Sequence, residues 1–387
     1  MKFGIPRETV EGENRVALIP RTVKQFVEQE HDILIESGAG VKAGYGNEQY
    51  REAGATILES VEDLYGQSDV IVKVNRVAHN QELNKDEVDL LREGQAIVSL
   101  LDPLNNLETI ARLVEKQATV FSMEFLPRIT RAQSMDVLSS MSTIAGYKAV
   151  LQAAGMLPKF FPLLMTAAGT IPPANTLIIG AGVAGLQAIA TAKRLGAKVS
   201  AFDTRPAVKE QVESLGARFV EMELEEEAET SGGYAKEMTE EFYQRELEVI
   251  GEQARRADVV ITTALIFGKK APILITEEMV KDMHYGAVIV DLAGVNGGNC
   301  ELARPGETIT EHGVTIHTPL NLPGTMPFHA SQMYSKNVGN FIEELYKEGS
   351  TEIDFENQVI ADTCIAHGGE IRNQMVQNAL EGKEAQT

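Results

Sequence analysis

The sequence is poor in cysteine and in basic residues, and it has no long uninterrupted apolar run. Its two cysteines, Cys300 and Cys364, are too few for a disulfide framework or a cysteine zinc site, so we expect a reducing compartment. Only 35 basic residues stand against 56 acidic ones, and the net charge of −21 argues against nucleic acid and anionic membrane surfaces as partners. The chain begins without an apolar signal segment.

Apolar sequence is densest over residues 160–192, where prolines and glycines interrupt it, so we expect no direct membrane insertion. The seven histidines are scattered singly, and we predict no metal site. His317 and His329 are the two that could face a cleft, although a structural role is commoner for a lone histidine. A chain of 387 residues with 43% hydrophobic content suggests two domains, each with its own core.

One stretch carries the most informative pattern in the chain. The apolar run 177–179 has the length of a strand buried on both faces, and it leads into the glycine-rich segment GAGVAG at 180–185. A helical pattern over 183–195 follows, then a second strand at 199–202 that ends on Asp203. Strand, glycine turn, helix and spaced acid together predict a dinucleotide-binding unit rather than a glycine-rich structural turn.

Each part of this fingerprint has a mechanical reason. Gly180 allows a tight turn, Gly182 lets a pyrophosphate approach the backbone, and Gly185 lets the helix pack close to the strand. The helix N-terminus offers free N–H groups to the phosphates. Asp203 would accept hydrogen bonds from the adenosine ribose and repel a 2′-phosphate, so we expect NAD rather than NADP, with Arg205 as a nearby cation.

Apolar runs alternate with helical patterns from residue 1 to about 126, which is typical of a parallel α/β sheet, and no glycine fingerprint occurs there. We therefore predict an α/β protein with two Rossmann-like domains, parallel sheets and the cofactor in the cleft between them. The first domain would be discontinuous, 1–136 plus 329–387, with helices at 330–346 and 359–371 and a polar tail. The NAD(H)-binding domain would span 137–328.

Two polar segments invite a functional interpretation. Residues 127–136 carry Arg128, Arg131, Gln133 and Asp136 ahead of a helical stretch at 137–151 whose small residues permit a close helix crossing. This segment is either a solvated turn or a clamp on the nicotinamide end of the cofactor. The acid-rich stretch 222–242 is either a mobile loop or a lid hinged at its Gly-Gly pair.

At this point the sequence resembles a known family, the NAD(H)-binding alpha subunit of proton-translocating NAD(P) transhydrogenase, in the version whose alpha polypeptide is divided in two, within the alanine dehydrogenase superfamily. The resemblance covers nearly the whole chain. Its motifs are the fingerprint together with RAQSMDVLSS (131–140), IAGY (144–147), TAAGTIPPA (166–174), KEQVESLG (209–216), GGYAKEM (232–238) and GGN (297–299). Alanine dehydrogenase shares GIP (4–6) and NRVA (14–17).

The resemblance implies direct hydride transfer from NADH to NADP⁺ held on a partner subunit, coupled to proton translocation. The implied partners are an NADP(H)-binding beta subunit and a small membrane alpha subunit, with this chain a homodimer in the cytoplasm, peripheral to the inner membrane. Residues implied to hold the nicotinamide and its ribose, and so to be catalytic, are Arg128, Gln133, Asp136 and Ser139. Residues implied to contact the rest of the cofactor are Arg131, Gly180, Ala181, Gly182, Val183, Gly185, Asp203, Thr204, Arg205, Gly233, Tyr234, Ala264 and Leu265. Such chemistry needs positioning and no acid or base.

The alternatives are a stand-alone alanine or amino-acid dehydrogenase and a non-catalytic NAD-binding module. Alanine dehydrogenases resemble this chain but have a lysine, a histidine and an acid where it has Asn75, Asp102 and Val295. Arg15, which can pair with a carboxylate, remains. The groups for imine formation and proton transfer are thus missing, which favours the transhydrogenase subunit.

Overall fold

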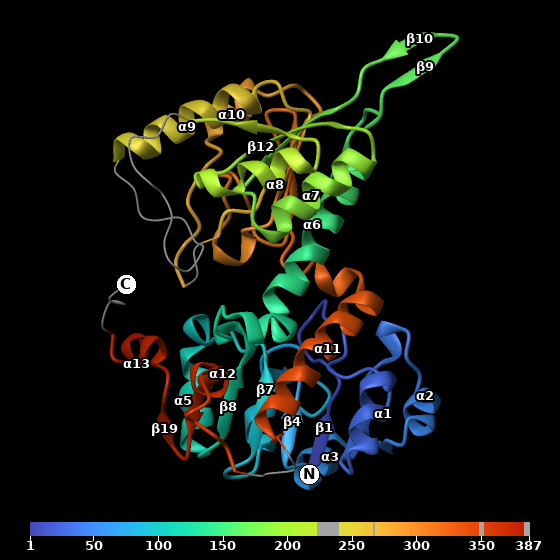
Figure 1. Ribbon diagram of the computed structural model, residues 1–387, viewed down its shortest axis with the longest axis vertical. Coiled ribbons are helices and arrows are strands. Elements are labelled where there is room, and N and C mark those ends of the chain that lie inside the picture. The colour runs from blue at the N-terminus through green and yellow to red at the C-terminus, as the bar shows by residue number, and fades with distance from the viewer. Residues whose placement is uncertain (223–239, 266–267, 348–351, 383–387) are drawn as a thin grey trace. The chain divides into compact units, whose positions relative to one another are not determined.

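The computed structural model describes residues 1–222, 240–265, 268–347 and 352–382. The chain forms two compact units: residues 1–141 with 323–387, and residues 142–322. Each unit contains one large, mainly parallel mixed sheet with helices on its faces, so the predicted α/β class is confirmed (Figure 1). No helix in the described parts of the chain is both long and apolar enough to cross a membrane.

The sheet of the first unit has the order β3-β2-β1-β4-β7-β8-β18-β19, and the strands from β3 to β8 are parallel. Its last two strands come from the C-terminal part of the chain and run antiparallel, β18 against β8 and β19 against β18. The strands are β1 (Lys2–Ile5), β2 (Asp32–Glu36), β3 (Thr56–Leu58), β4 (Val70–Val72), β7 (Ala96–Ser99), β8 (Thr119–Ser122), β18 (Cys364–His367) and β19 (Glu370–Ile371), with a separate pair β5 (His79–Asn80) and β6 (Lys85–Asp86).

Helices cover both faces of this sheet because its strands are apolar on both sides. On one face Phe3 meets Phe26 and Phe121 meets Phe341, each with ring centroids 5.6 Å apart. On the other face Ile71 packs in a separate apolar cluster with residues of α3 and α5. The helices of the unit are α1 (Pro20–Glu28), α2 (Asn47–Glu52), α3 (Val61–Gln67), α4 (Glu87–Leu90), α5 (Leu107–Glu115), α11 (Pro327–Leu345), α12 (Gln358–Thr363) and α13 (Gln374–Leu380).

The C-terminal prediction was partly wrong. The expected helix at 359–371 ends at Thr363, and Cys364–His367 and Glu370–Ile371 are strands. The chain reverses at Gly368 and Gly369, both with positive φ, which a helix cannot accommodate. The expected polar tail contains helix α13, capped by Asn373 and anchored by the buried Val376.

The sheet of the second unit has the order β13-β12-β11-β14-β15-β17-β16, and all neighbours are parallel except the edge pair β16–β17. Its strands are β11 (Asn175–Ile179), β12 (Lys198–Phe202), β13 (Arg218–Val220), β14 (Val259–Thr262), β15 (Val288–Asp291), β16 (Thr308–Glu311) and β17 (Val314–His317), with a separate hairpin of β9 (Leu164–Thr166) and β10 (Gly169–Ile171). The order reverses direction between β11 and β14, as in doubly wound nucleotide-binding sheets.

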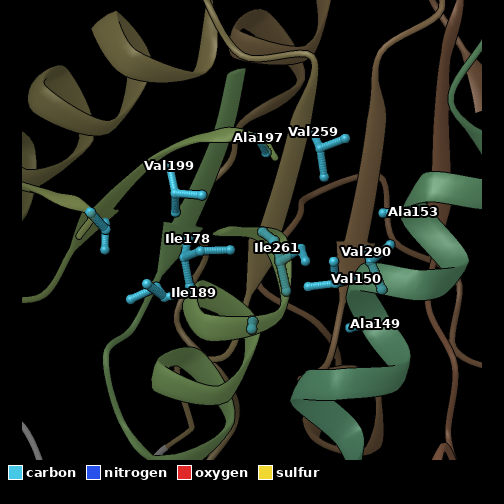
Figure 2. Close-up of a cluster of buried hydrophobic side chains, with 14 of the residues drawn as sticks. Ala149, Val150, Ala153, Ile178, Ile189, Ala197, Val199, Val259, Ile261 and Val290 are labelled. Atoms are coloured by element: carbon cyan, nitrogen blue, oxygen red, sulfur yellow. The ribbon is translucent and has the colours of Figure 1, made fainter. Parts of the chain in front are cut away.

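Alternate residues of each strand enter different cores, as the period of two requires. Ile178 and Ile261 belong to a cluster with α6, α7 and α8, where Val150 of α6 lies near Ile261 and Val290 (Figure 2). Leu177 and Val260 belong to the opposite cluster, with α9 and α10. The helices are α6 (Val137–Met156), which joins the two units, and α7 (Val183–Arg194), α8 (Lys209–Ser214), α9 (Glu240–Ala254) and α10 (Glu277–Asp282).

Candidate functional site

In the second unit, predicted cofactor-binding residues gather at the carboxyl ends of three neighbouring strands. Gly180–Val183 follow β11, Asp203–Arg205 follow β12, and Ala264–Leu265 lie just beyond β14. These strands adjoin the point where the sheet order reverses, which is where ligands bind in open α/β sheets. Gly233 and Tyr234 lie outside the described residues.

The glycine turn has the geometry that its residues predict. Gly180 has a φ of +92°, and a Cβ there would lie 2.4 Å from the Thr263 Oγ. A Cβ on Gly185 would lie 1.9 Å from the Gly180 carbonyl oxygen, so only glycine allows α7 to start this close to β11. The α6 helix also approaches closely, because a Cβ on Gly146 would lie 2.1 Å from the Ala184 carbonyl oxygen.

Gly182 is different, because no described atom lies within 4 Å of a Cβ built there and its φ of −73° suits any residue. It is the N-cap of α7, whose first N–H groups have no partner within the helix. The space beside this helix end is therefore open for a negatively charged group that approaches the backbone. Packing within the described chain does not explain glycine at this position.

Asp203 is held by the chain's own donors. One carboxylate oxygen accepts the Arg205 backbone N–H and Nε, both at 2.9 Å, and the other accepts the Ala181 N–H at 2.7 Å and the Arg205 Nη2 at 2.9 Å. Asp203 thereby ties the glycine turn to the end of β12. Burial, and to a smaller extent the negative charge of Asp203, raises the pKa of Glu246 on α9 to about 7.

The other predicted group lies in the first unit, on a short 3₁₀ helix at Thr130–Met135 that precedes α6. Ala132 and Met135 are buried, whereas Arg131 and Gln133 are exposed, as is Arg128 just before the helix. Asn337 and Asn340 of α11 both donate side-chain N–H groups to the Ser134 carbonyl, at 2.9 and 3.0 Å. Arg131 donates to Asn357 Oδ1 at 2.9 Å.

Asp136 caps α6. One of its carboxylate oxygens accepts the Ser139 backbone N–H at 2.8 Å and the other accepts the Ser139 hydroxyl at 2.6 Å. This is the usual geometry of an acidic N-cap, with the third helical residue as donor. Asp136 and Ser139 are thus brought together as predicted neighbours, and their contact also fixes the start of α6.

Arg15, the residue left from the alanine dehydrogenase pattern, is engaged within the first unit. Its guanidinium forms a two-point ion pair with Glu13, at 2.7 and 2.6 Å, and the arginine is 5% exposed. The amide of Asn75 donates to the same Glu13 carboxylate at 3.2 Å. Burial alone would raise the pKa of Glu13, but the hydrogen bond and charge of Arg15 outweigh it and lower that pKa.

Two predicted histidines have structural surroundings. His317 contacts the Thr308 hydroxyl and the Gln152 amide oxygen, and burial lowers its pKa. His329 packs against Phe328. Within the described residues, no group of three or more His, Cys, Asp or Glu side chains could hold a metal ion.

Residues 149–374 match the family described as alanine dehydrogenase/PNT, C-terminal domain, and residues 4–145 match its N-terminal domain. The chain belongs to the alanine dehydrogenase/PNT family. It is 46% identical, over the whole of both chains, to the first of the two polypeptides that make up the NAD(P) transhydrogenase alpha subunit of Rhodospirillum rubrum. The predicted kinship with that subunit is thereby confirmed.

Two further relatives bracket the family. The transhydrogenase structure from Sinorhizobium meliloti has a TM-score of 0.83 and 38% identity, covering 97% of this chain and 100% of that one. Alanine dehydrogenase 2 of Staphylococcus aureus is 29% identical, over 98% of this chain and 97% of its own length. The chain is therefore nearer in sequence to these transhydrogenases than to this dehydrogenase.

Sequence reasoning missed Asn299 as a functional candidate, although it belongs to the GGN motif at 297–299. Its carboxamide contacts Ala264, one of the predicted cofactor-binding residues. Glu246 was also missed, because its closeness to Asp203 depends on how α9 packs on the sheet.

Proposed function

We propose that this chain is the NAD(H)-binding subunit of a proton-translocating NAD(P) transhydrogenase. NADH binds to the second unit, and its hydride passes directly to NADP⁺ on an NADP(H)-binding beta subunit. A small membrane alpha subunit couples that transfer to proton movement. This chain acts as a homodimer in the cytoplasm, peripheral to the inner membrane through its partners.

The observation that carries the proposal is the full-length match to a transhydrogenase alpha subunit, together with the edge formed by Gly180–Val183, Asp203–Arg205 and Ala264–Leu265. The open space at Gly182 suits a pyrophosphate, which the N-terminus of α7 would attract. Asp203 faces the adenosine ribose in this proposal, Thr204 adjoins it, and Arg205 lies where a 2′-phosphate would otherwise bind.

In the first unit, Arg128, Arg131, Gln133, Asp136 and Ser139 serve the nicotinamide end. The exposed Gln133 amide presents a donor and an acceptor on one plane, which suits a ribose or carboxamide. Asp136 and Ser139 keep the start of α6 in place beneath it. NADH supplies the hydride, so these side chains contribute orientation and exclusion of water rather than acid or base chemistry.

A stand-alone alanine dehydrogenase is disfavoured by the same structure. Such an enzyme needs a cation free to bind the substrate carboxylate and a proton-transfer group. Here Arg15 is paired with Glu13, and Asn75 completes that contact where the related enzymes have lysine. Asp102 is exposed and bonds the Asn105 amide.

The test is a pair of assays on the purified chain. Mixed with an NADP(H)-binding transhydrogenase domain, it should reduce an NADP⁺ analogue at the expense of NADH, and omission of either protein should abolish the transfer. Alone, it should neither oxidise alanine with NAD⁺ nor consume NADH with pyruvate and ammonium. Robust turnover in the alanine assay would overturn the proposal, as would an absence of hydride transfer in the mixture.

A further inference from the structure

Asn299 occupies an unusual place in the second unit. It is fully buried and lies in the loop after β15, yet its side chain pairs with backbone from beyond the end of β14. Its Oδ1 accepts the Ala264 N–H at 3.1 Å, and its Nδ2 donates to the Ala264 carbonyl at 2.9 Å. The same Nδ2 donates to the Pro272 carbonyl at 2.8 Å.

This pairing reproduces what an adjacent strand would supply. The last backbone bond between the two strands' ends is Leu292 N–H to the Thr262 carbonyl. Ala264 lies past that point, where it needs one donor and one acceptor for its own backbone groups. The Asn299 carboxamide, which has both on one planar group, extends the ladder to this residue.

The Asn299 backbone is itself anchored, so its side chain is a rigid support. One oxygen of the buried Asp291 carboxylate accepts the N–H groups of Asn299 and Cys300, at 2.7 and 2.8 Å. The Asn299 carbonyl accepts from Leu274 and Ile275, at 2.8 and 3.0 Å. A Cβ on Gly298 would lie 2.9 Å from Asp291, and its φ is +93°, so glycine is needed for this approach.

The supported segment adjoins the glycine turn. The Thr263 N–H donates to the Ile179 carbonyl at 2.8 Å, and the Thr263 hydroxyl donates to the Gly180 carbonyl at 3.1 Å. Leu265, two residues on, is 40% exposed. The direction in which Ala264 and Leu265 leave the sheet is therefore set on one side by the glycine turn and on the other by Asn299.

We propose that Asn299 is a positioning residue that holds Ala264 and Leu265 at the carboxyl edge of the sheet in the orientation that receives the dinucleotide. This inference rests on the proposed function, because it takes the edge to be the NADH site. Asn299 acts through Ala264 and does not itself contact the nucleotide. Its contribution is to binding, so its loss should raise the KM for NADH and leave the hydride-transfer step largely unchanged.

The experiment compares two substitutions with a matched control in the full chain. Asn299→Ala removes all three side-chain bonds, and Asn299→Asp keeps the shape but loses both donated bonds. The control is Asp258→Asn, at the amino end of the same strand, where the carboxylate accepts the Asn175 N–H at 2.9 Å and pairs with Lys159. It perturbs a comparably buried polar contact at the opposite edge of the sheet.

NADH affinity is measured by fluorescence titration well below each variant's unfolding midpoint, and hydride transfer is measured with an NADP(H)-binding partner. Both Asn299 variants should bind NADH about tenfold more weakly or worse, because Ala264 loses its fixed backbone partners. Their kcat at saturating NADH should stay within about threefold of the wild-type value. Asp258→Asn should keep the wild-type affinity even if its midpoint falls.

Wild-type affinity in a folded Asn299 variant would overturn the inference. Equal weakening in Asp258→Asn would also overturn it, because the effect would then be general loss of stability. If Asn299→Ala does not fold, Asn299→Asp carries the test, since its side chain has the same size. A wild-type chain that fails to bind NADH would instead refute the proposed function.

Discussion

The Arg205 guanidinium lies flat against the Asp203 carboxylate, with Nε and Nη2 each 2.9 Å from a different oxygen. Both partners are largely buried, with 16% of the arginine side chain and 6% of the aspartate side chain exposed. With the Ala181 and Arg205 N–H groups added, the four acceptor sites of the carboxylate are filled. A ribose hydroxyl can bond Asp203 only by displacing one of these donors, and Arg205 is the movable one.

The first prediction concerns the choice of nucleotide. The wild-type chain should bind NADPH about tenfold more weakly than NADH or worse, because Asp203 repels a 2′-phosphate and holds Arg205 away from it. Asp203→Ser should narrow that ratio, since Arg205 is then released toward the phosphate. Fluorescence titration with both nucleotides measures the ratio. Adding Arg205→Ala should remove the gain for NADPH, and equal wild-type affinities for the two nucleotides would refute the assignment.

The second prediction separates two glycines of the same turn. Gly185→Ala places a Cβ on the Gly180 carbonyl and should lower the free energy of unfolding by at least about 2 kcal/mol. Gly182→Ala meets no described atom and should cost under about 1 kcal/mol, the difference between N-cap residues. It should nevertheless weaken NADH binding at least tenfold, because a methyl group would occupy the proposed pyrophosphate position.

Denaturant unfolding and NADH titration, run on both variants, check this pair. A Gly182→Ala chain that binds NADH normally would mean that the dinucleotide does not approach the backbone there. A fully stable Gly185→Ala chain would contradict the packing of α7 on β11.

The third prediction concerns Gln133. Gln133→Asn keeps the amide but retracts it by one methylene, and a misplacement of about 1 Å can cost on the order of 100-fold in rate. NADH affinity should change little, because the pyrophosphate and adenosine contacts belong to the second unit. Hydride transfer to an NADP⁺ analogue, beside a direct NADH titration, checks both parts.

Ser134→Ala is the matched control, since Ser134 is the exposed neighbour and its backbone carbonyl would still accept from Asn337 and Asn340. Losses of affinity and rate in equal proportion would make Gln133 an ordinary binding residue. An unaffected rate would make the 128–136 segment a structural turn.

The fourth prediction concerns pH and the buried Glu8. Burial is the main cause that raises its pKa to about 7, and Lys73, 3.7 Å away, offsets only part of this effect. A folded-state pKa above the unfolded value means that the folded state binds the proton more tightly. Stability from this group is therefore present below about pH 4.5 and is lost as pH rises toward 7.

Glu8→Gln removes that loss, so the stability of the variant relative to the wild type should increase between about pH 5 and 7 and then level off. The expected increase is on the order of 1–3 kcal/mol. Urea unfolding at several pH values measures it, with the exposed Glu62→Gln as control. A flat difference across this range would show that Glu8 stays ionised in the folded chain.

Much of the architecture could be predicted because the relevant signals are local. The strands β11 and β12, the helix α7 and the glycine turn between them follow from short-range apolar periodicity and from residues that the turn geometry requires. The C-terminal prediction failed because the apolar run after Thr363 suits a helix or a strand equally. Pairing of Cys364 with Phe121, far away in the sequence, decided for a strand.

The candidate site divides in the same way. Composition, periodicity and motif spacing by themselves determined the α/β class, the dinucleotide fingerprint, the acid at the end of the second strand and the family. Only the tertiary structure decided that Arg205 neutralises Asp203, that Glu13 engages Arg15, and that Asn299 supports Ala264. The physical reason is that a turn or a helix depends on nearby residues, whereas the partners of a buried polar group depend on which distant segments the sheet brings together.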